Sequence, residues 1–248
     1  MLRYLIILII LSFNHQVIGQ IDEFAGEKIS FFSLDSLEIT ADLYVIENKR
    51  APYIILYHQA NSSRGEYRNI APKLNDLGFN CIAIDQRSGH KSQGITNETC
   101  KRAIKANKKI RFTSAIPDTE ATLQYVKNIL KAEEIIIWGS SYSASVVFYL
   151  GSKYPRDVDA IIAFSPGEYL KINDKSIASF SPDINCPIFI ASGKKEQKKW
   201  DDIYNGITVQ KSFFIPKVGG AHGSKALWPD TKGNESYWNA INIFLGSI

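Results

Sequence analysis

The sequence predicts an α/β protein, with a mostly parallel central sheet of about eight strands, helices on both faces and an antiparallel hairpin at the N-terminus. Two observations lead to this fold class. Short, almost entirely apolar runs recur along the chain, as expected for strands that are buried on both faces of a parallel sheet. Segments with helical periodicity separate these runs, so strands and helices alternate in right-handed crossover units.

Each element is assigned from its own pattern. Lys28–Phe32 and Leu37–Ile46 flank the turn residues Asp35 and Ser36 and form the predicted hairpin. The other predicted strands are the apolar runs Tyr53–Tyr57, Phe79–Ile84, Ile135–Trp138, Ala160–Phe164, Ile188–Ala191 and Phe213–Ile215. The predicted helices are the periodic segments Glu66–Leu77, Asp118–Leu130, Tyr142–Tyr154, Trp200–Tyr204 and Glu235–Leu245.

The amino-acid composition excludes several classes of protein. The chain has 248 residues, of which 45% are apolar and 22% charged, so a disordered, collagen-like or coiled-coil protein is excluded. A net charge of +4 is too small to indicate a nucleic-acid partner. The three cysteines form no cluster with histidine at zinc-ligand spacing, and we predict neither a metal nor a cofactor. Nothing in the sequence indicates the oligomeric state.

The N-terminus resembles a secretory signal peptide. Arg3 supplies a positive charge, and the apolar run Tyr4–Phe13 is too short for a membrane span, which needs about 20 residues. Val17–Gly19 then offers a cleavage site before Gln20. We predict that residues 1–19 are a signal peptide, that the mature chain has no stable membrane span, and that it is secreted or periplasmic. An uncleaved membrane anchor is the alternative.

A candidate nucleophile lies in Gly139-Ser140-Ser141-Tyr142-Ser143, between a predicted strand and a predicted helix. A sharp strand–turn–helix connection of the form G-x-S-x-G raises the central serine above the sheet in many hydrolases. Ser141 lies two residues after Gly139 and is therefore preferred to Ser140. Ser143 stands where the pattern has its second glycine.

A serine hydroxyl needs a base, and the base needs a carboxylate. His222 is the predicted base, because its glycine-rich loop follows the last predicted strand. Glu196 is the predicted acid, because it follows the penultimate strand and gives the chain order serine, acid, histidine. Glu168, after the preceding strand, is the alternative. His58 is expected to shape the turn that follows its own strand.

The tetrahedral intermediate of acyl transfer needs two N–H donors for its oxyanion. One is predicted to be the backbone N–H of Tyr142, directly after the nucleophile. The other is expected from the turn after Tyr53–Tyr57, at Gln59 or Ala60.

Residues 89–117 interrupt the alternation with a long basic insertion. It contains seven basic residues and a single acidic one, Glu98. Long insertions in compact domains often have a function, so this segment is expected either to form a wall of the substrate cleft or to be a solvated excursion.

These motifs together resemble the α/β-hydrolase superfamily, and in particular its dienelactone-hydrolase-like and serine-aminopeptidase-like members. The resemblance extends over residues 28–248 and implies a single α/β-hydrolase domain with the insertion at 89–117. It places the second oxyanion donor at Ala60. The residues that carry it are Tyr57-His58-Gln59-Ala60-Asn61, Asp85-Gln86-Arg87-Ser88-Gly89-His90-Lys91-Ser92, Gly193-Lys194-Lys195-Glu196 and Gly220-Ala221-His222-Gly223.

The resemblance implies an exported serine hydrolase that cleaves carboxylic esters or related small acyl compounds through an acyl-enzyme, with Ser141, His222 and Glu196 as its triad. Dienelactone hydrolases use a cysteine nucleophile, whereas position 141 is serine. Two other functions stay open. One is a serine peptidase that acts on short peptides. The other is an inactive binding protein of the same fold, since Gln59, Asn61 and Ser143 replace glycines of the family pattern.

Overall fold

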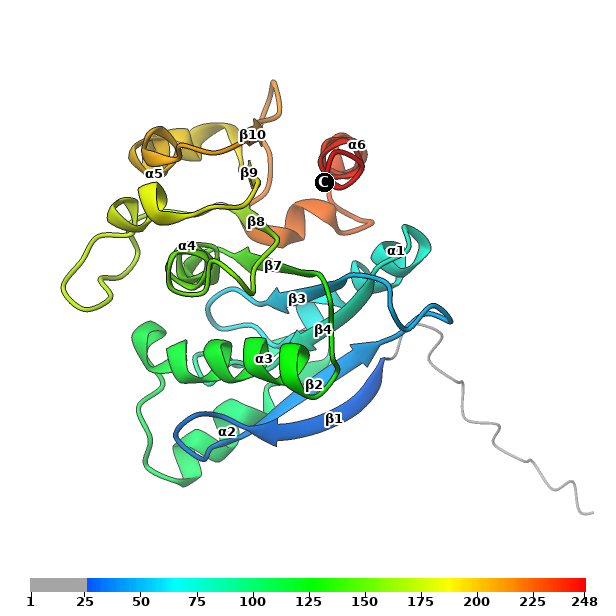
Figure 1. Ribbon diagram of the computed structural model, residues 1–248, viewed down its shortest axis with the longest axis vertical. Coiled ribbons are helices and arrows are strands. Elements are labelled where there is room, and N and C mark those ends of the chain that lie inside the picture. The colour runs from blue at the N-terminus through cyan, green and yellow to red at the C-terminus, as the bar shows by residue number, and fades with distance from the viewer. Residues whose placement is uncertain (1–25) are drawn as a thin grey trace, which may run out of the picture.

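An eight-stranded sheet organises the part of the chain that the computed structural model describes, residues 26–248 (Figure 1). In the order in which they lie side by side, the strands are β1 (Glu27–Phe32), β2 (Glu38–Tyr44), β4 (Asn80–Ile84), β3 (Tyr53–Tyr57), β7 (Ile135–Ser140), β8 (Ala160–Phe164), β9 (Ile188–Ala191) and β10 (Lys211–Phe214). Strand β2 pairs antiparallel with β1 and with β4, and all other neighbours are parallel. The predicted fold class and the N-terminal hairpin are confirmed.

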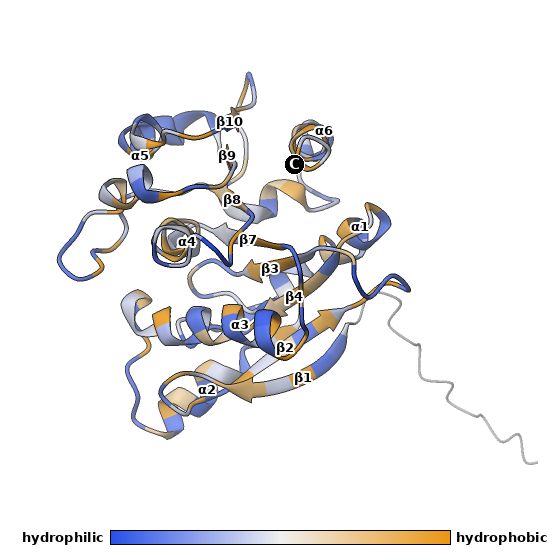
Figure 2. Ribbon diagram, viewed as in Figure 1, coloured by the Kyte–Doolittle hydropathy of each residue, from blue (hydrophilic) through white to orange (hydrophobic). Residues whose placement is uncertain are grey.

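Helices cover both faces of this sheet (Figure 1). One face carries α3 (Ile116–Asn128), α4 (Tyr142–Lys153) and α5 (Asp201–Gly206), and the other carries α1 (Ala71–Asp76) and α6 (Asn234–Leu245). In β3, Ile55 belongs to the core on the first face, and Ile54 and Leu56 belong to the core on the second. Because both faces are covered, the central strands are apolar throughout and appear orange in Figure 2.

Two elements differ most clearly from the prediction. The helix expected over Glu66–Leu77 is divided into a 3₁₀ turn, Arg64–Tyr67, and the short helix α1. Pro72 lies in the first turn of α1, where its missing N–H costs no hydrogen bond, and this favours a helix start there. The last strand is Lys211–Phe214 instead of Phe213–Ile215. It is an edge strand with half-exposed and exposed residues, so its apolar residues do not mark its limits.

The insertion has more regular structure than the sequence predicts. It contains a small hairpin of β5 (Lys91–Ser92) and β6 (Ile95–Thr96), the helix α2 (Glu98–Lys105) and a 3₁₀ turn, Phe112–Ala115. The Asn97 side chain caps α2 by accepting a hydrogen bond from the N–H of Cys100 at 2.7 Å. Asn97 in cap position was an available sequence signal for this helix, which was not predicted.

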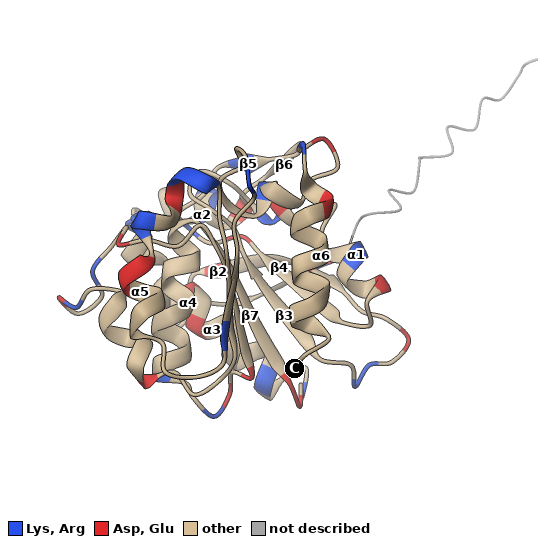
Figure 3. Ribbon diagram, turned by 90° about the horizontal axis from the view of Figure 1, so that it is seen from above, with Lys and Arg blue, Asp and Glu red and all other residues tan. Residues whose placement is uncertain are grey.

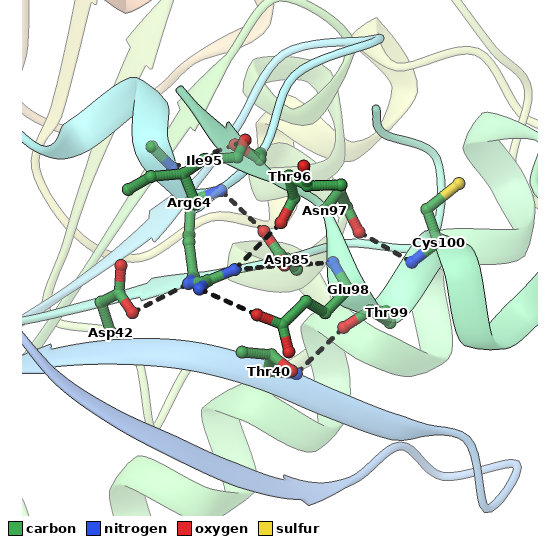
Figure 4. Close-up of polar contacts among 12 residues, drawn as sticks. Thr40, Asp42, Arg64, Asp85, Ile95, Thr96, Asn97, Glu98, Thr99 and Cys100 are labelled. Carbon is green, nitrogen blue, oxygen red and sulfur yellow. Dashed lines mark hydrogen bonds and ion pairs between the residues drawn. The ribbon is translucent and has the colours of Figure 1, made fainter. Parts of the chain in front are cut away.

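A buried ionic cluster ties the insertion to the sheet (Figure 4). The guanidinium of Arg64 bonds Asp42 of β2 at 2.8 Å, Asp85 after β4 at 2.7 Å and Glu98 of α2 at 3.3 Å. Asp85 also accepts hydrogen bonds from the backbone N–H groups of Arg64 and Glu98. Arg64 thus pairs with three carboxylates, but burial outweighs this pairing for Asp42 and Asp85 and raises the pKa of both.

Basic side chains of the insertion also hold it to the N-terminal hairpin. Arg102 forms an ion pair with Glu38 at 3.5 Å, and Lys108 forms one with Asp35 at 3.0 Å. Of the basic residues of α2, Arg102 is therefore fastened to the hairpin, whereas Lys101 and Lys105 are exposed. The central strands β3, β4 and β7 carry no charged residue and are tan in Figure 3.

The three cysteines lie buried without a disulfide in the described chain. Between residues 26 and 248, no helix has the length and hydrophobicity that a membrane span requires. The predicted signal peptide, residues 1–19, and His15 within it lie outside the described residues.

Candidate active site

Ser141 occupies a strained turn between β7 and α4. Its backbone has φ 58° and ψ −120°, in a region that residues other than glycine rarely adopt. Gly139 makes the close approach of strand and helix possible, because a Cβ at this position would lie 2.3 Å from the carbonyl oxygen of Ser143. The turn therefore has the strand–turn–helix geometry expected of a nucleophile elbow.

Ser143 adds a hydrogen-bonding role to the position where the family pattern has glycine. Its hydroxyl accepts a hydrogen bond from the N–H of Ser140 at 2.9 Å and donates one to the carbonyl oxygen of Tyr57 at 2.6 Å. The side chain is fully buried. It thus joins the first turn of α4 to the ends of β7 and β3, on both sides of Ser141.

The structure brings Ser141, His222 and Glu196 together in one chain of hydrogen bonds. His222 Nε2 lies 2.7 Å from Ser141 Oγ, and His222 Nδ1 lies 2.5 Å from Glu196 Oε1. An ionised carboxylate can only accept a hydrogen bond, so the imidazole carries its proton on Nδ1 and donates it toward Glu196, which leaves Nε2 free to accept the serine proton. This arrangement can activate a hydroxyl group as a nucleophile.

The surroundings of Glu196 keep it ionised. Its second oxygen, Oε2, accepts hydrogen bonds from the hydroxyl of Ser165 at 2.7 Å and from the N–H of Gly193 at 3.0 Å. Burial raises the pKa of Glu196, but the hydrogen bonds from His222 and Ser165 outweigh burial and leave this pKa below its usual value. A negative charge therefore faces the imidazole.

The alternative acid, Glu168, bonds to the backbone of the segment after β8. Its two carboxylate oxygens accept hydrogen bonds from the N–H groups of Ile177 and Ala178, both at 2.7 Å. These bonds hold the start of the 3₁₀ turn Ala178–Asp183. Glu168 is therefore a structural group of the segment that follows β8.

Of the two N–H groups in the turn after β3 that are candidate oxyanion donors, only one remains available. The N–H of Gln59 donates to the buried carboxylate of Glu66 at 2.9 Å, so it is not available to an oxyanion. Ala60 is the next residue and remains the candidate. The other candidate, Tyr142, begins α4, and the first N–H groups of a helix have no acceptor within the helix.

His58 holds the turn after β3 in place through hydrogen bonds of both ring nitrogens. Its Nε2 accepts a hydrogen bond from the N–H of Gln86 at 2.9 Å, and its Nδ1 lies 2.7 Å from the carbonyl oxygen of Gln59. Because Nε2 accepts from an N–H, it carries no proton, and Nδ1 carries the proton that is donated to the Gln59 carbonyl oxygen. Burial lowers the pKa of His58 and so favours this neutral ring. Asn97, at the start of α2, lies 3.1 Å from the same Nε2 and connects the insertion to this turn. His90 is exposed at the edge of the insertion.

The side chain of Tyr142 forms a second link to the insertion. It is buried, its hydroxyl accepts a hydrogen bond from Gln86 at 2.7 Å, and it also bonds the hydroxyl of Ser88. The ring of Phe112, from the insertion, stacks on the Tyr142 ring with 4.4 Å between centroids. The insertion therefore lies against the residue that follows Ser141.

Sequence reasoning did not identify Ser165 or Glu66 as part of this site. Ser165 directly follows β8, at the edge of the sheet where catalytic groups gather, and this position was an available signal. Glu66 lay within a predicted helix, where its contact with Gln59 could not be foreseen. Within residues 26–248, no group of three or more His, Cys, Asp or Glu side chains could hold a metal ion.

Comparisons with known proteins agree with the observed fold. Residues 52–194 match a family model described as alpha/beta hydrolase fold. No curated protein sequence matches the chain. A solved dienelactone hydrolase from Anabaena variabilis is similar, with 15% identity and a TM-score of 0.67, over 87% of this chain and 95% of that one.

Two further solved structures have the same fold. An esterase from Pyrococcus furiosus is 17% identical, with a TM-score of 0.65, over 89% of this chain and 91% of its own. Est1E from Butyrivibrio proteoclasticus, with ferulic acid bound, is 14% identical, with a TM-score of 0.69, over 88% of this chain and 98% of its own. At these identities the likeness shows the fold alone.

Proposed function

The chain belongs to the alpha/beta hydrolase fold family, and we propose that it is a serine hydrolase that cleaves carboxylic esters or related small acyl compounds. The observation that carries this proposal is the continuous hydrogen-bond chain from Ser141 Oγ through His222 to Glu196, with distances of 2.7 and 2.5 Å. The similar esterases support an ester as substrate.

In the proposed mechanism, Ser141 Oγ attacks the carbonyl carbon of the substrate while His222 Nε2 takes the hydroxyl proton. The N–H groups of Tyr142 and Ala60 stabilise the oxyanion of the tetrahedral intermediate. When the intermediate collapses, His222 returns its proton to the leaving alkoxide, and an acyl group remains on Ser141. Water then attacks the acyl-enzyme with His222 as base, and the carboxylic acid leaves. Glu196 stabilises the imidazolium in both halves.

The proposal is tested by kinetics on two substrate classes. A p-nitrophenyl ester is expected to give an initial burst of p-nitrophenol, because p-nitrophenol leaves as the acyl-enzyme forms and the acyl-enzyme is then hydrolysed more slowly. The Ser141→Ala variant is expected to give neither burst nor turnover above about 10⁻⁴ of the wild-type rate. Faster turnover of aminoacyl anilides than of esters would instead indicate a peptidase. No turnover of either class would contradict an active enzyme.

We further propose that the protein is exported and that residues 1–19 are removed. Arg3 followed by the apolar run Tyr4–Phe13 supports this proposal. N-terminal sequencing of the protein from cell fractions tests it. A mature protein outside the cytoplasm that begins at Gln20 is expected, and a chain that begins at Met1 in the membrane fraction would identify an uncleaved anchor.

A further inference from the structure

The hydroxyl of Ser165 connects the loop of the acid to the loop of the histidine. Ser165 is fully buried and directly follows β8. Its Oγ lies 2.7 Å from Glu196 Oε2 and accepts a hydrogen bond from the N–H of Gly223, next to His222, at 2.9 Å. Three separate segments thus meet at a single hydroxyl group.

The direction of these hydrogen bonds is fixed. The N–H of Gly223 can only donate, so Ser165 Oγ is the acceptor there. The single proton of the hydroxyl is then available for the carboxylate of Glu196, which can only accept when ionised. The Ser165 proton therefore lies on Oε2, while Oε1 faces His222.

We propose that Ser165 is a positioning residue, which orients the Glu196 carboxylate toward His222. The catalytic meaning of this role rests on the proposed function. A glutamate side chain has one more rotatable bond than an aspartate side chain, so its carboxylate needs more contacts to keep one orientation. Without the hydroxyl, Oε2 would retain the N–H of Gly193, from the carboxylate's own turn, and the link to the histidine loop would be lost.

The backbone of Ser165 has a separate role that the experiment must distinguish. Its φ is 55°, in the left-handed region that favours glycine. Its N–H donates to the carbonyl oxygen of Ala191 at 2.6 Å, and its carbonyl oxygen accepts from the Tyr169 hydroxyl at 3.2 Å. Alanine at this position would remove only the hydroxyl and keep the strain, whereas glycine would remove the hydroxymethyl group, keep these backbone bonds and relieve the strain.

The test therefore compares Ser165→Ala and Ser165→Gly with a matched control, Ser145→Ala. Ser145 is also fully buried, and its hydroxyl bonds the backbone of Gly167 in the same segment after β8. Its hydroxyl has its hydrogen-bond partners in Gly167 and forms no hydrogen bond with Glu196 or His222 in the described structure. A loss of stability without a change at the histidine is expected in Ser145→Ala.

The first readout requires no substrate. In the wild-type protein, the proton between His222 Nδ1 and Glu196 should give a far-downfield proton resonance, which is assigned by its absence in His222→Gln. Both Ser165 variants are expected to shift or broaden this resonance, and Ser145→Ala is expected to keep it in place. An unshifted resonance in both Ser165 variants would overturn the proposal.

The second readout is kinetic. Both Ser165 variants should lower kcat on a p-nitrophenyl ester about 10- to 100-fold with little change in KM, because a small displacement of the acid misaligns the base. The acid limb of the kcat profile should move to higher pH, because a carboxylate without this donor is more basic and holds the imidazolium proton more tightly. If Ser165→Gly has the wild-type kcat and pH profile, the hydroxyl has no positioning role. If the wild type hydrolyses no ester, the proposed function fails, and the resonance still decides the role of Ser165.

Discussion

The ring of Phe112 lies nearly parallel to the ring of Tyr142, with 4.4 Å between centroids and 12° between planes. Tyr142 directly follows Ser141, whereas Phe112 belongs to the insertion at 89–117. The residue Phe112 is 36% exposed, so it presents apolar surface close to the nucleophile elbow. This relationship favours the insertion as a wall of the substrate cleft over a solvated excursion.

Phe112→Ala is therefore expected to lower kcat/KM for large esters more than for small ones. Loss of an aromatic contact of about 1.5 kcal/mol should lower kcat/KM for a bulky aryl ester about tenfold. An acetyl ester, which is too small to reach the ring, should lose much less. Ile110→Ala, at another partly exposed apolar residue of the insertion, is the control. Equal losses for both esters would show that the ring only supports Tyr142.

Glu196→Gln is expected to lower kcat about 10³- to 10⁴-fold with little loss of stability, because an amide favours the wrong tautomer of the imidazole. Glu168→Gln is the matched control, since it changes a carboxylate that bonds only backbone N–H groups. Steady-state kinetics on one ester compares the two. A larger loss in Glu168→Gln would move the acid to the segment after β8.

Ser143→Ala is expected to lower the free energy of unfolding by roughly 1–3 kcal/mol, because it leaves the buried N–H of Ser140 without its acceptor. Urea denaturation measures this change. Ser179→Ala, which removes an exposed serine hydroxyl, is the control and should have little effect. Wild-type stability in Ser143→Ala would show that a glycine-like residue serves equally well at this position.

Stability should also depend on pH through Asp35. Hydrogen bonds from Arg87 hold the pKa of Asp35 well below its usual range. A carboxyl group with a lowered folded-state pKa stabilises the fold above its unfolded pKa, about 3.9, and this contribution is lost as the pH falls through the folded value. Asp35→Asn should therefore be less stable than the wild type at pH 7, and the difference should shrink in strong acid.

The control for Asp35 is Asp230→Asn, which removes a carboxylate from an exposed loop. Urea denaturation of all three proteins at pH 7 and at low pH provides the comparison. If the difference in the free energy of unfolding between Asp35→Asn and the wild type is the same at every pH, the interaction of Arg87 with residue 35 does not require an ionised carboxylate.

The sequence was sufficient for the sheet because strands such as Tyr53–Tyr57 are buried on both faces and so are apolar throughout. It also indicated Ser141, His222 and Glu196, because each follows a predicted strand and parallel strands end at one edge. Side-chain contacts between distant segments leave no such pattern. The stabilisation of α2 by Arg64 and the link from Ser165 to Glu196 depend on tertiary structure, and neither could be predicted.

The central claim is that Ser141 is the nucleophile that becomes acylated. A fluorophosphonate probe tests it most directly, because an activated serine attacks phosphorus and expels fluoride to leave a stable adduct. Mass spectrometry of the digested protein then locates the label. The account predicts one label per chain, on Ser141, and no label in the His222→Gln variant. A label on Ser140, or labelling that persists without His222, would contradict it.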